Sequence, residues 1–157
     1  MKTSTKYLIV ISLLTIFLSG CKKGGTTPDP VVPDTTKPTI SVTKPSAGQT
    51  FVAGNTIDFQ ATFSDNVSLK SYEIAISKVV TGGLTLKFVP NSVPFNYLKS
   101  STNFTSGVKQ QEINLSDIKI PSNTATTITT LGKYNFKVTY VDGSNNSAET
   151  TLEININ

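Results

Sequence analysis

Residues 133–141, KYNFKVTYV, decide the fold of this 157-residue chain. Apolar Tyr134, Phe136, Val138 and Tyr140 alternate there with polar residues. Because successive side chains of a β-strand point to opposite faces, this period of two predicts a strand with one buried and one solvated face. Such strands are typical of antiparallel sheets that pack one face on a core.

The same alternation recurs on both sides of this stretch. It is clearest in residues 56–63 and at the end of the chain in residues 151–156. Further strands are expected at residues 39–43, 71–80, 84–88 and 110–115. Turn sequences rich in Gly, Asn, Asp, Ser and Pro separate these segments, and none of them has the 3.6-residue period of a helix.

About seven short strands in residues 38–157 predict an all-β fold, an immunoglobulin-like antiparallel β-sandwich. Two facing sheets bury the apolar faces that either sheet alone would leave in water. Residues 89–107 are polar and irregular, so we expect a long loop there with at most one edge strand.

Composition excludes several classes of function. The chain has no histidine and one cysteine, so a Ser–His or Cys–His nucleophile pair, a His-ligated metal site and an internal disulfide are impossible. It also lacks the fingerprint motifs of cofactor enzymes, so we expect a non-enzymatic protein without a cofactor. Arginine is absent and the net charge is only +4, which argues against nucleic-acid binding. We expect the domain to be monomeric.

The N-terminus carries an export signal, expected at residues 1–20. Lys2 and Lys6 precede an apolar run of twelve residues, 7–18. As a helix this run would reach roughly 18 Å, well short of the ~30 Å hydrocarbon core of a bilayer. A short apolar run after a positive start is typical of a cleaved secretory signal rather than a membrane span.

The end of this signal resembles the lipobox of bacterial lipoproteins: Leu18, Ser19, Gly20 and Cys21. The resemblance implies that the Cys21 thiol receives a diacylglycerol, that cleavage occurs just before it, and that the new amine is acylated. Two or three acyl chains would hold the protein to a membrane. Because Lys22 rather than aspartate follows Cys21, inner-membrane retention is not signalled, and the outer membrane is expected.

Residues 21–37 are expected to form a flexible tether. Residues 22–37, KKGGTTPDPVVPDTTK, are rich in Pro, Gly and Thr and have no hydrophobic period. Fully extended, these residues would span about 50 Å. Within them, Asp34-Thr35-Thr36 resembles a short O-glycosylation acceptor of some Gram-negative bacteria, which makes Thr35 a candidate modification site.

Longer stretches resemble known domains. DTTKPTISVTKPSAGQTFVAGNTIDFQATFSDN and LGKYNFKVTYVDGSNNSAETTLEI are similar to the first strands and the last hairpin of bacterial Ig-like repeats, with Tyr134 at the place of the tyrosine corner. SDNVSLKSYEIAI and the residues after Ser106 resemble an uncharacterised family of Bacteroidetes lipoproteins, domain of unknown function 4625. That resemblance implies a fold and a lipid anchor and assigns no activity. The His- and Asp-rich stretch associated with the family is absent here.

Two loop sequences are candidates for a Ca²⁺ site. They contribute Asp65 with Asn66, and Asp142 with Asn145. Ca²⁺ takes six to eight oxygen ligands, and Ig-like repeats sometimes bind it at one end of the sandwich. A site would require Asp65 and Asp142 to converge, with Asp34 as a third ligand. The alternative is that these residues only stabilise tight turns, which Asp and Asn favour.

Three aromatic residues in the irregular stretch are candidates for glycan contact: Phe95, Tyr97 and Phe104. They lack the inward phase of a strand, so partial exposure is expected. The sequence thus predicts a lipid-anchored envelope protein whose domain binds or scaffolds another envelope protein or a surface glycan. The alternative is a carbohydrate- or Ca²⁺-binding accessory module of an outer-membrane polysaccharide-uptake system.

Overall fold

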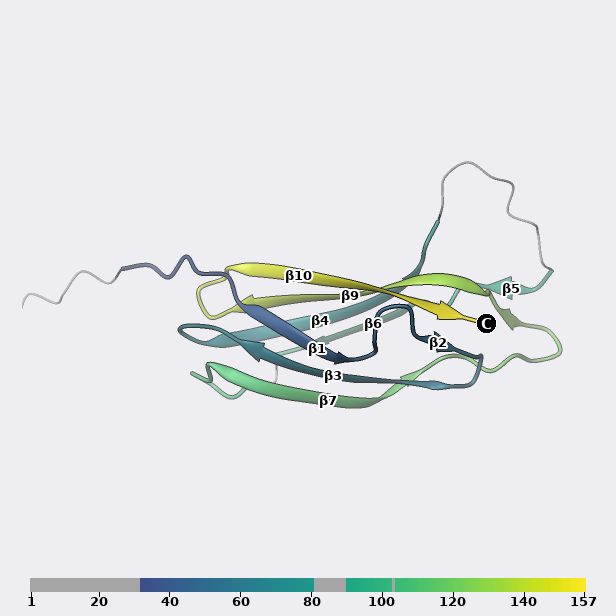
Figure 1. Cartoon of the computed structure of the whole chain (residues 1–157), viewed down its shortest axis with the longest axis horizontal. Helices are drawn as coiled ribbons and strands as arrows, with labels where there is room; N and C mark the ends of the chain where they lie inside the picture. The colour runs from purple at the N-terminus through teal and green to yellow at the C-terminus, as the bar shows by residue number, and fades with distance from the viewer. Residues whose placement is uncertain (1–31, 81–89, 103) are drawn as a thin grey trace, which may run out of the picture. The chain divides into compact units, whose positions relative to one another are not determined.

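A computed structural model describes residues 32–80, 90–102 and 104–157. They form an immunoglobulin-like β-sandwich (Figure 1). The three-stranded sheet has the order β1 (Thr39–Lys44), β3 (Thr56–Ser64), β7 (Gln110–Lys119). The five-stranded sheet has the order β2 (Thr50–Phe51), β10 (Ser147–Ile156), β9 (Gly132–Asp142), β4 (Leu69–Lys78), β6 (Tyr97–Ser101). A small third sheet pairs β5 (Ser92–Val93) with β8 (Ile128–Thr129).

The predicted fold class is confirmed, and seven of the ten strands in the described residues are longer than two residues. The expected strand at residues 84–88 lies outside the described residues. Six of these longer strands match predicted segments. The remaining one is β6, which lies within the stretch expected to be mostly loop and forms the edge of the five-stranded sheet. Among the described residues, no helix is long and apolar enough to cross a membrane.

The core is the layer between the two sheets, and the alternating residues of β3 and β9 form its centre. Phe59 of β3 stacks on Phe136 of β9 with ring centroids 5.7 Å apart. Both side chains are at most 1% exposed. The period of two in the sequence is therefore the period of burial, because one face of each strand contacts the opposite sheet.

β4 and β9 pair along their whole length in the middle of the five-stranded sheet, and β9 pairs on its other side with β10. Because these pairs are antiparallel, the β3–β4 turn and the β9–β10 turn lie at the same end of the sandwich (Figure 1). We call this the carboxylate end, defined by Asp34, Asp65 and Asp142. The opposite end, which carries β2, β8 and the start of β9, is called the corner end.

The corner end is closed by the tyrosine corner. The Tyr134 hydroxyl donates to the Thr130 carbonyl and accepts a bond from the Phe95 amide at 3.3 Å. Gly132, two residues earlier, has φ +113°, a conformation that residues with a Cβ rarely adopt. The hydroxyl thus connects the start of β9 to the segment before β6, which stabilises this end without an ion.

Candidate metal centre

Three carboxylates from separate parts of the chain meet at the carboxylate end. One oxygen each of Asp34, Asp65 and Asp142 lies within 4.8 Å of the others. Asp34 precedes β1, Asp65 follows β3, and Asp142 is the last residue of β9. The convergence that a cation site would require is therefore present in the structure.

Asp65 is positioned by the turn between β3 and β4. Its Oδ1 atom accepts hydrogen bonds from the backbone amides of Val67 and Ser68 at 2.8 and 2.7 Å. Such bonds to the backbone two and three residues on are what make aspartate a favoured turn residue. They occupy one carboxylate oxygen and leave the other, Oδ2, for a different contact.

Asp142 is fully buried, with 0% of its surface exposed. Its Oδ1 atom accepts the amides of Ser144 and Asn146, both at 2.8 Å, and its Oδ2 atom accepts the Asn146 side-chain amide at 2.7 Å. A buried charge is costly unless it is hydrogen-bonded or paired, and here the donors are neutral. The bonds fix the carboxylate in place and do not neutralise it.

Asp34 is held by side chains from both turns. Its Oδ1 atom accepts the Asn66 amide at 2.9 Å and the Thr36 backbone amide at 3.1 Å. Its backbone carbonyl accepts the Asn146 side-chain amide at 3.1 Å. The bond from Asn66, followed by that from Thr36, lowers the pKa of the Asp34 carboxyl below its usual value, since these donors favour the charged form.

The two turns approach each other at Gly143. Its amide donates to the Ser68 carbonyl at 2.8 Å. A Cβ at this position would lie 2.1 Å from the Ser68 hydroxyl oxygen but at least 3.5 Å from the other Ser68 atoms, so a side chain there would require the Ser68 hydroxyl to rotate. The Gly143–Ser68 hydrogen bond therefore joins the β3–β4 and β9–β10 turns, which carry Asp65 and Asp142.

Two carboxylate oxygens of the cluster lack a hydrogen-bond partner within the described residues. The Oδ2 atoms of Asp34 and Asp65 are buried from solvent and receive no hydrogen bond from the described residues. The ion pairs found in the described part of the chain join lysines to other carboxylates: Lys99–Asp117, Lys133–Glu153 and Lys137–Glu149. Buried polar atoms in proteins nearly always have a partner, so two unpaired oxygens within one carboxylate cluster are unusual and call for a ligand.

The asparagines predicted beside these aspartates differ in their roles. Asn66 donates to Asp34 and belongs to the cluster. Asn145 does not: it has φ +70° in the turn, and its side-chain oxygen accepts the Lys70 ammonium at 2.6 Å. The neighbouring Asn146, which sequence reasoning missed, links Asp34 to Asp142 instead. Only the presence of two consecutive asparagines in DGSNN hinted at it.

The expected exposure of the candidate glycan-contact aromatics is wrong for two of the three. Phe95 is 5% exposed and Phe104 is 9% exposed, whereas Tyr97 is half-buried. Phe95 packs 6.4 Å from the Tyr134 ring, and Phe104 packs edge-on against Phe63 at 5.3 Å. Their segments lack strand periodicity, yet each ring fills a gap at the margin of the core.

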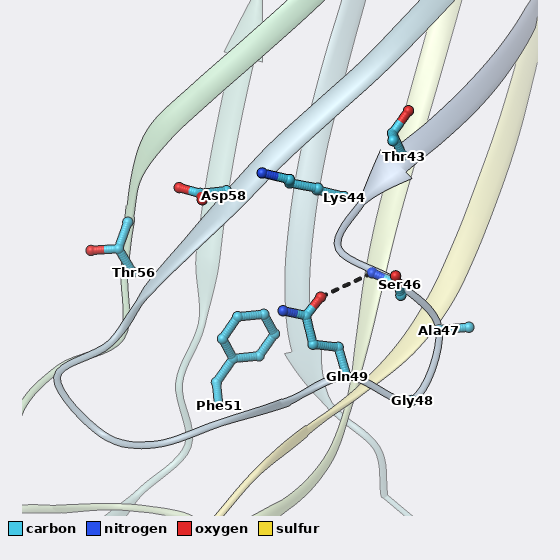
Figure 2. A pocket seen from close by; sticks show the side chains of 9 residues that line it. All are labelled: Thr43, Lys44, Ser46, Ala47, Gly48, Gln49, Phe51, Thr56 and Asp58. Carbon is cyan, nitrogen blue, oxygen red and sulfur yellow. Dashed lines mark hydrogen bonds between the residues drawn. The ribbon is translucent and has the colours of Figure 1, made fainter.

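A groove lies at the corner end (Figure 2). This groove of about 620 Å³ is lined by the chain between β1 and β2 and by the start of β3. Its charged side chains are Lys44 and Asp58, and the Gln49 side chain accepts the Ser46 amide at 3.0 Å. One ammonium, one carboxylate and an already bonded amide do not form a cluster of metal-ligating or nucleophilic groups.

The predicted lipobox, Leu18, Ser19, Gly20 and Cys21, lies outside the described residues, as does the signal at residues 1–20. The described contacts of the sandwich begin at Asp34, ahead of the boundary expected at residue 38. Thr35, the candidate glycosylation residue, follows Asp34 directly and is exposed.

Solved structures with a similar arrangement have low sequence identity to the chain. The fibronectin(III)-like modules of Clostridium thermocellum CbhA are 19% identical, with 75% of this chain and 94% of that chain covered and a TM-score of 0.41. The sporulation control protein Spo0M of Bacillus subtilis is 9% identical, with 76% and 48% covered and a TM-score of 0.40. A mutant β-glucosidase of Listeria innocua is 9% identical, with 74% and 16% covered and a TM-score of 0.40.

The chain spans less than half the length of the latter two proteins. The sandwich assignment rests on the strand order and the core described above. No curated protein matches the sequence. The profile of one family matches residues 20–157, which is most of the chain. The chain therefore belongs to the family described as a domain of unknown function (DUF4625).

Proposed function

We propose that the chain is a lipid-anchored protein of the bacterial cell envelope, whose Ig-like domain serves as a non-enzymatic binding or scaffolding module. The observation that carries the proposal is the position of the only cysteine. Cys21 follows Leu18, Ser19 and Gly20 at the end of an apolar run and precedes a Pro- and Thr-rich segment. Lipidation of that residue would leave the sandwich presented on a tether that starts at residue 21 and ends where Asp34 contacts the sandwich.

The outer membrane is the expected location, because Lys22 rather than aspartate follows Cys21. The partner would be another envelope protein or a surface polysaccharide, and the domain would act as a monomer. Support for a non-enzymatic role comes from the absence of histidine and from the corner-end groove, whose charged residues are one lysine and one aspartate.

A second candidate function is an accessory module of an outer-membrane polysaccharide-uptake system, binding carbohydrate or Ca²⁺. The burial of Phe95 and Phe104 removes two of the three aromatics on which the carbohydrate form relied. Tyr97 remains half-buried on β6. The Ca²⁺ form gains support from the converging carboxylates, so it is the better supported of the two.

Replacing the cysteine tests the anchor. In cells that express the full chain, Cys21→Ser should shift the protein from the membrane to the soluble fraction and abolish incorporation of labelled palmitate. The shift is expected because two or three acyl chains, at ~0.8 kcal/mol per buried CH₂, supply the membrane affinity. Ser19→Ala is the matched control, since it keeps a small residue before the cysteine and should leave the protein anchored. A Cys21→Ser protein as firmly membrane-bound as the wild type would refute the proposal.

A further inference from the structure

We infer that Asp34, Asp65 and Asp142 bind one Ca²⁺ ion, and that the ion holds the segment before β1 to the β3–β4 and β9–β10 turns. The inference rests on the second candidate function, which includes Ca²⁺ binding, and is independent of the lipid anchor. Its first support is the spacing of the carboxylates. Oxygens bound to one Ca²⁺ at 2.3–2.6 Å on opposite sides lie about 5 Å apart. Three oxygens within 4.8 Å of one another therefore fit around a single ion.

The second support is independent of that spacing. The Oδ2 atoms of Asp34 and Asp65 are buried and form no hydrogen bond within the described residues. Each of these carboxylates already uses its Oδ1 atom for backbone or amide donors. An unpaired buried carboxylate oxygen is costly, more so beside the fully buried Asp142. A cation would satisfy both oxygens at once.

The charge of the site favours a divalent ion over a hydrogen-bond donor. Three carboxylates bring three negative charges together, and the described ion pairs of the lysines lie elsewhere. Lys70, which contacts the β9–β10 turn, donates to Asn145. A divalent cation would reduce the formal charge of the cluster from −3 to −1, which replaces mutual repulsion by attraction.

The donor chemistry identifies the class of metal. The chain has no histidine and its one cysteine is Cys21, so the nitrogen and sulfur ligands of zinc or copper sites are missing at this end. An all-oxygen site suits hard cations. Ca²⁺ accepts irregular geometry with carboxylates, carbonyls and water, whereas Mg²⁺ demands a near-ideal octahedron. A site assembled from three separate segments meets the requirements of Ca²⁺ better.

Ca²⁺ would also define where the domain begins. Asp34 stands four residues before Pro38 and is attached to the sandwich through Asn66 and Asn146. Without the ion those amides hold it against the repulsion of two neighbouring carboxylates. With the ion bound, residues 34–37 become part of the folded domain. The Ca²⁺ concentration would therefore determine whether the folded domain begins near residue 34 or near residue 38.

The test is thermal unfolding of the full chain in detergent, in 10 mM CaCl₂ and in EGTA. If Kd is about 10⁻⁴–10⁻³ M, as in extracellular modules, the melting temperature should rise by about 5–10 °C in Ca²⁺. Asp65→Asn keeps the oxygen that accepts the Val67 and Ser68 amides, so its melting temperature in EGTA should equal or exceed that of the wild type. Its rise in Ca²⁺ should be lost.

Asp58→Asn is the matched control, because Asp58 is an exposed aspartate on β3 outside the cluster, and it should keep the full rise. Amide hydrogen exchange of residues 34–37 should slow at least tenfold in Ca²⁺. The proposal is overturned if the wild-type melting temperature does not change, if Asp65→Asn responds like the wild type, or if MgCl₂ gives an equal rise. Membrane fractionation of Asp65→Asn should match the wild type, which separates this result from the test of the anchor.

Discussion

The two ends of the sandwich differ in how their buried polar groups are bonded. At the corner end, buried polar groups bond to neutral partners: the Tyr134 hydroxyl bonds to Thr130, and the Thr129 hydroxyl donates to the Pro121 carbonyl at 3.0 Å. At the carboxylate end, Asp34 and Asp65 each keep a buried oxygen without a partner in the described chain. The polar groups named at the corner end are all hydrogen-bonded, whereas the three carboxylates of the carboxylate end form no ion pair within the described residues.

The comparison teaches that closure of a β-sandwich and the presence of a binding site are separable. Both ends connect strands through tight turns, and both enclose aromatic residues of the core. Within the described residues, the cluster of three carboxylates lies at the carboxylate end, where like charges raise the free energy of the folded state when no ion is bound. Variants at the two ends should therefore differ in their response to Ca²⁺ as well as in the size of their effects.

The largest effect is expected for Phe104→Ala, beneath the carboxylate end. Phe104 contacts Phe63 and Tyr72 with ring centroids 5.3 and 5.6 Å away, so its removal leaves a cavity. We expect a loss of about 3–5 kcal/mol in the free energy of unfolding, measured by urea denaturation. Leu98→Ala on β6, a side chain that is 68% exposed, is the control and should change little. If Phe104→Ala left the free energy of unfolding almost unchanged, Phe104 would not be a core residue, and its prediction as a surface glycan contact would stand again.

A medium effect is expected for Tyr134→Phe at the corner end. The change leaves the Thr130 carbonyl and the Phe95 amide without their partner, at a cost of about 1–3 kcal/mol. The loss should be equal in Ca²⁺ and in EGTA, because this end is closed without an ion. Tyr140→Phe is the control on the same strand, since no hydrogen bond to its hydroxyl is found in the described part of the chain. A Ca²⁺-dependent loss would contradict the contrast between the ends.

The smallest effect is expected for Lys99→Met, between the ends. Lys99 of β6 pairs with Asp117 of β7 at 2.5 Å and so links the edges of the two sheets. Both side chains are partly exposed, at 30% and 61%, so the pair should contribute at most about 1 kcal/mol at low salt. The difference should fall further in 0.5 M NaCl, where screening weakens the attraction. Lys119→Met removes an exposed lysine of β7 as the control.

Much of the fold follows from the sequence, because burial on one face imposes a period of two. That period also contains a signal for the site. Asp142 continues the inward phase of Phe136, Val138 and Tyr140, and Asp65 continues that of Phe63. A carboxylate in the place of a core residue at a strand end indicates a buried charge that requires a partner.

The remaining features depend on tertiary contacts that no local pattern encodes. Phe95 and Phe104 lie in polar surroundings in the sequence, and their burial depends on the distant rings of Tyr134 and Phe63. Asp34 lies in a segment whose composition predicts a tether, and the side-chain amides of Asn66 and Asn146 attach it to the domain. Its inclusion in the cluster requires that β4 and β9 be neighbours, which brings the two turns together.

The pairing of β1 with β3 also determines how the domain responds to mechanical force. β1 runs antiparallel to β3, with Thr39 opposite Ser64 at the carboxylate end, where the chain enters the sandwich. A pull on the preceding segment, away from that end, acts along β1. Because antiparallel hydrogen bonds are perpendicular to the strands, such a pull shears them together instead of opening them one by one. If Cys21 anchors the chain as proposed, a load on the segment before β1 would be carried by all the β1–β3 hydrogen bonds at once.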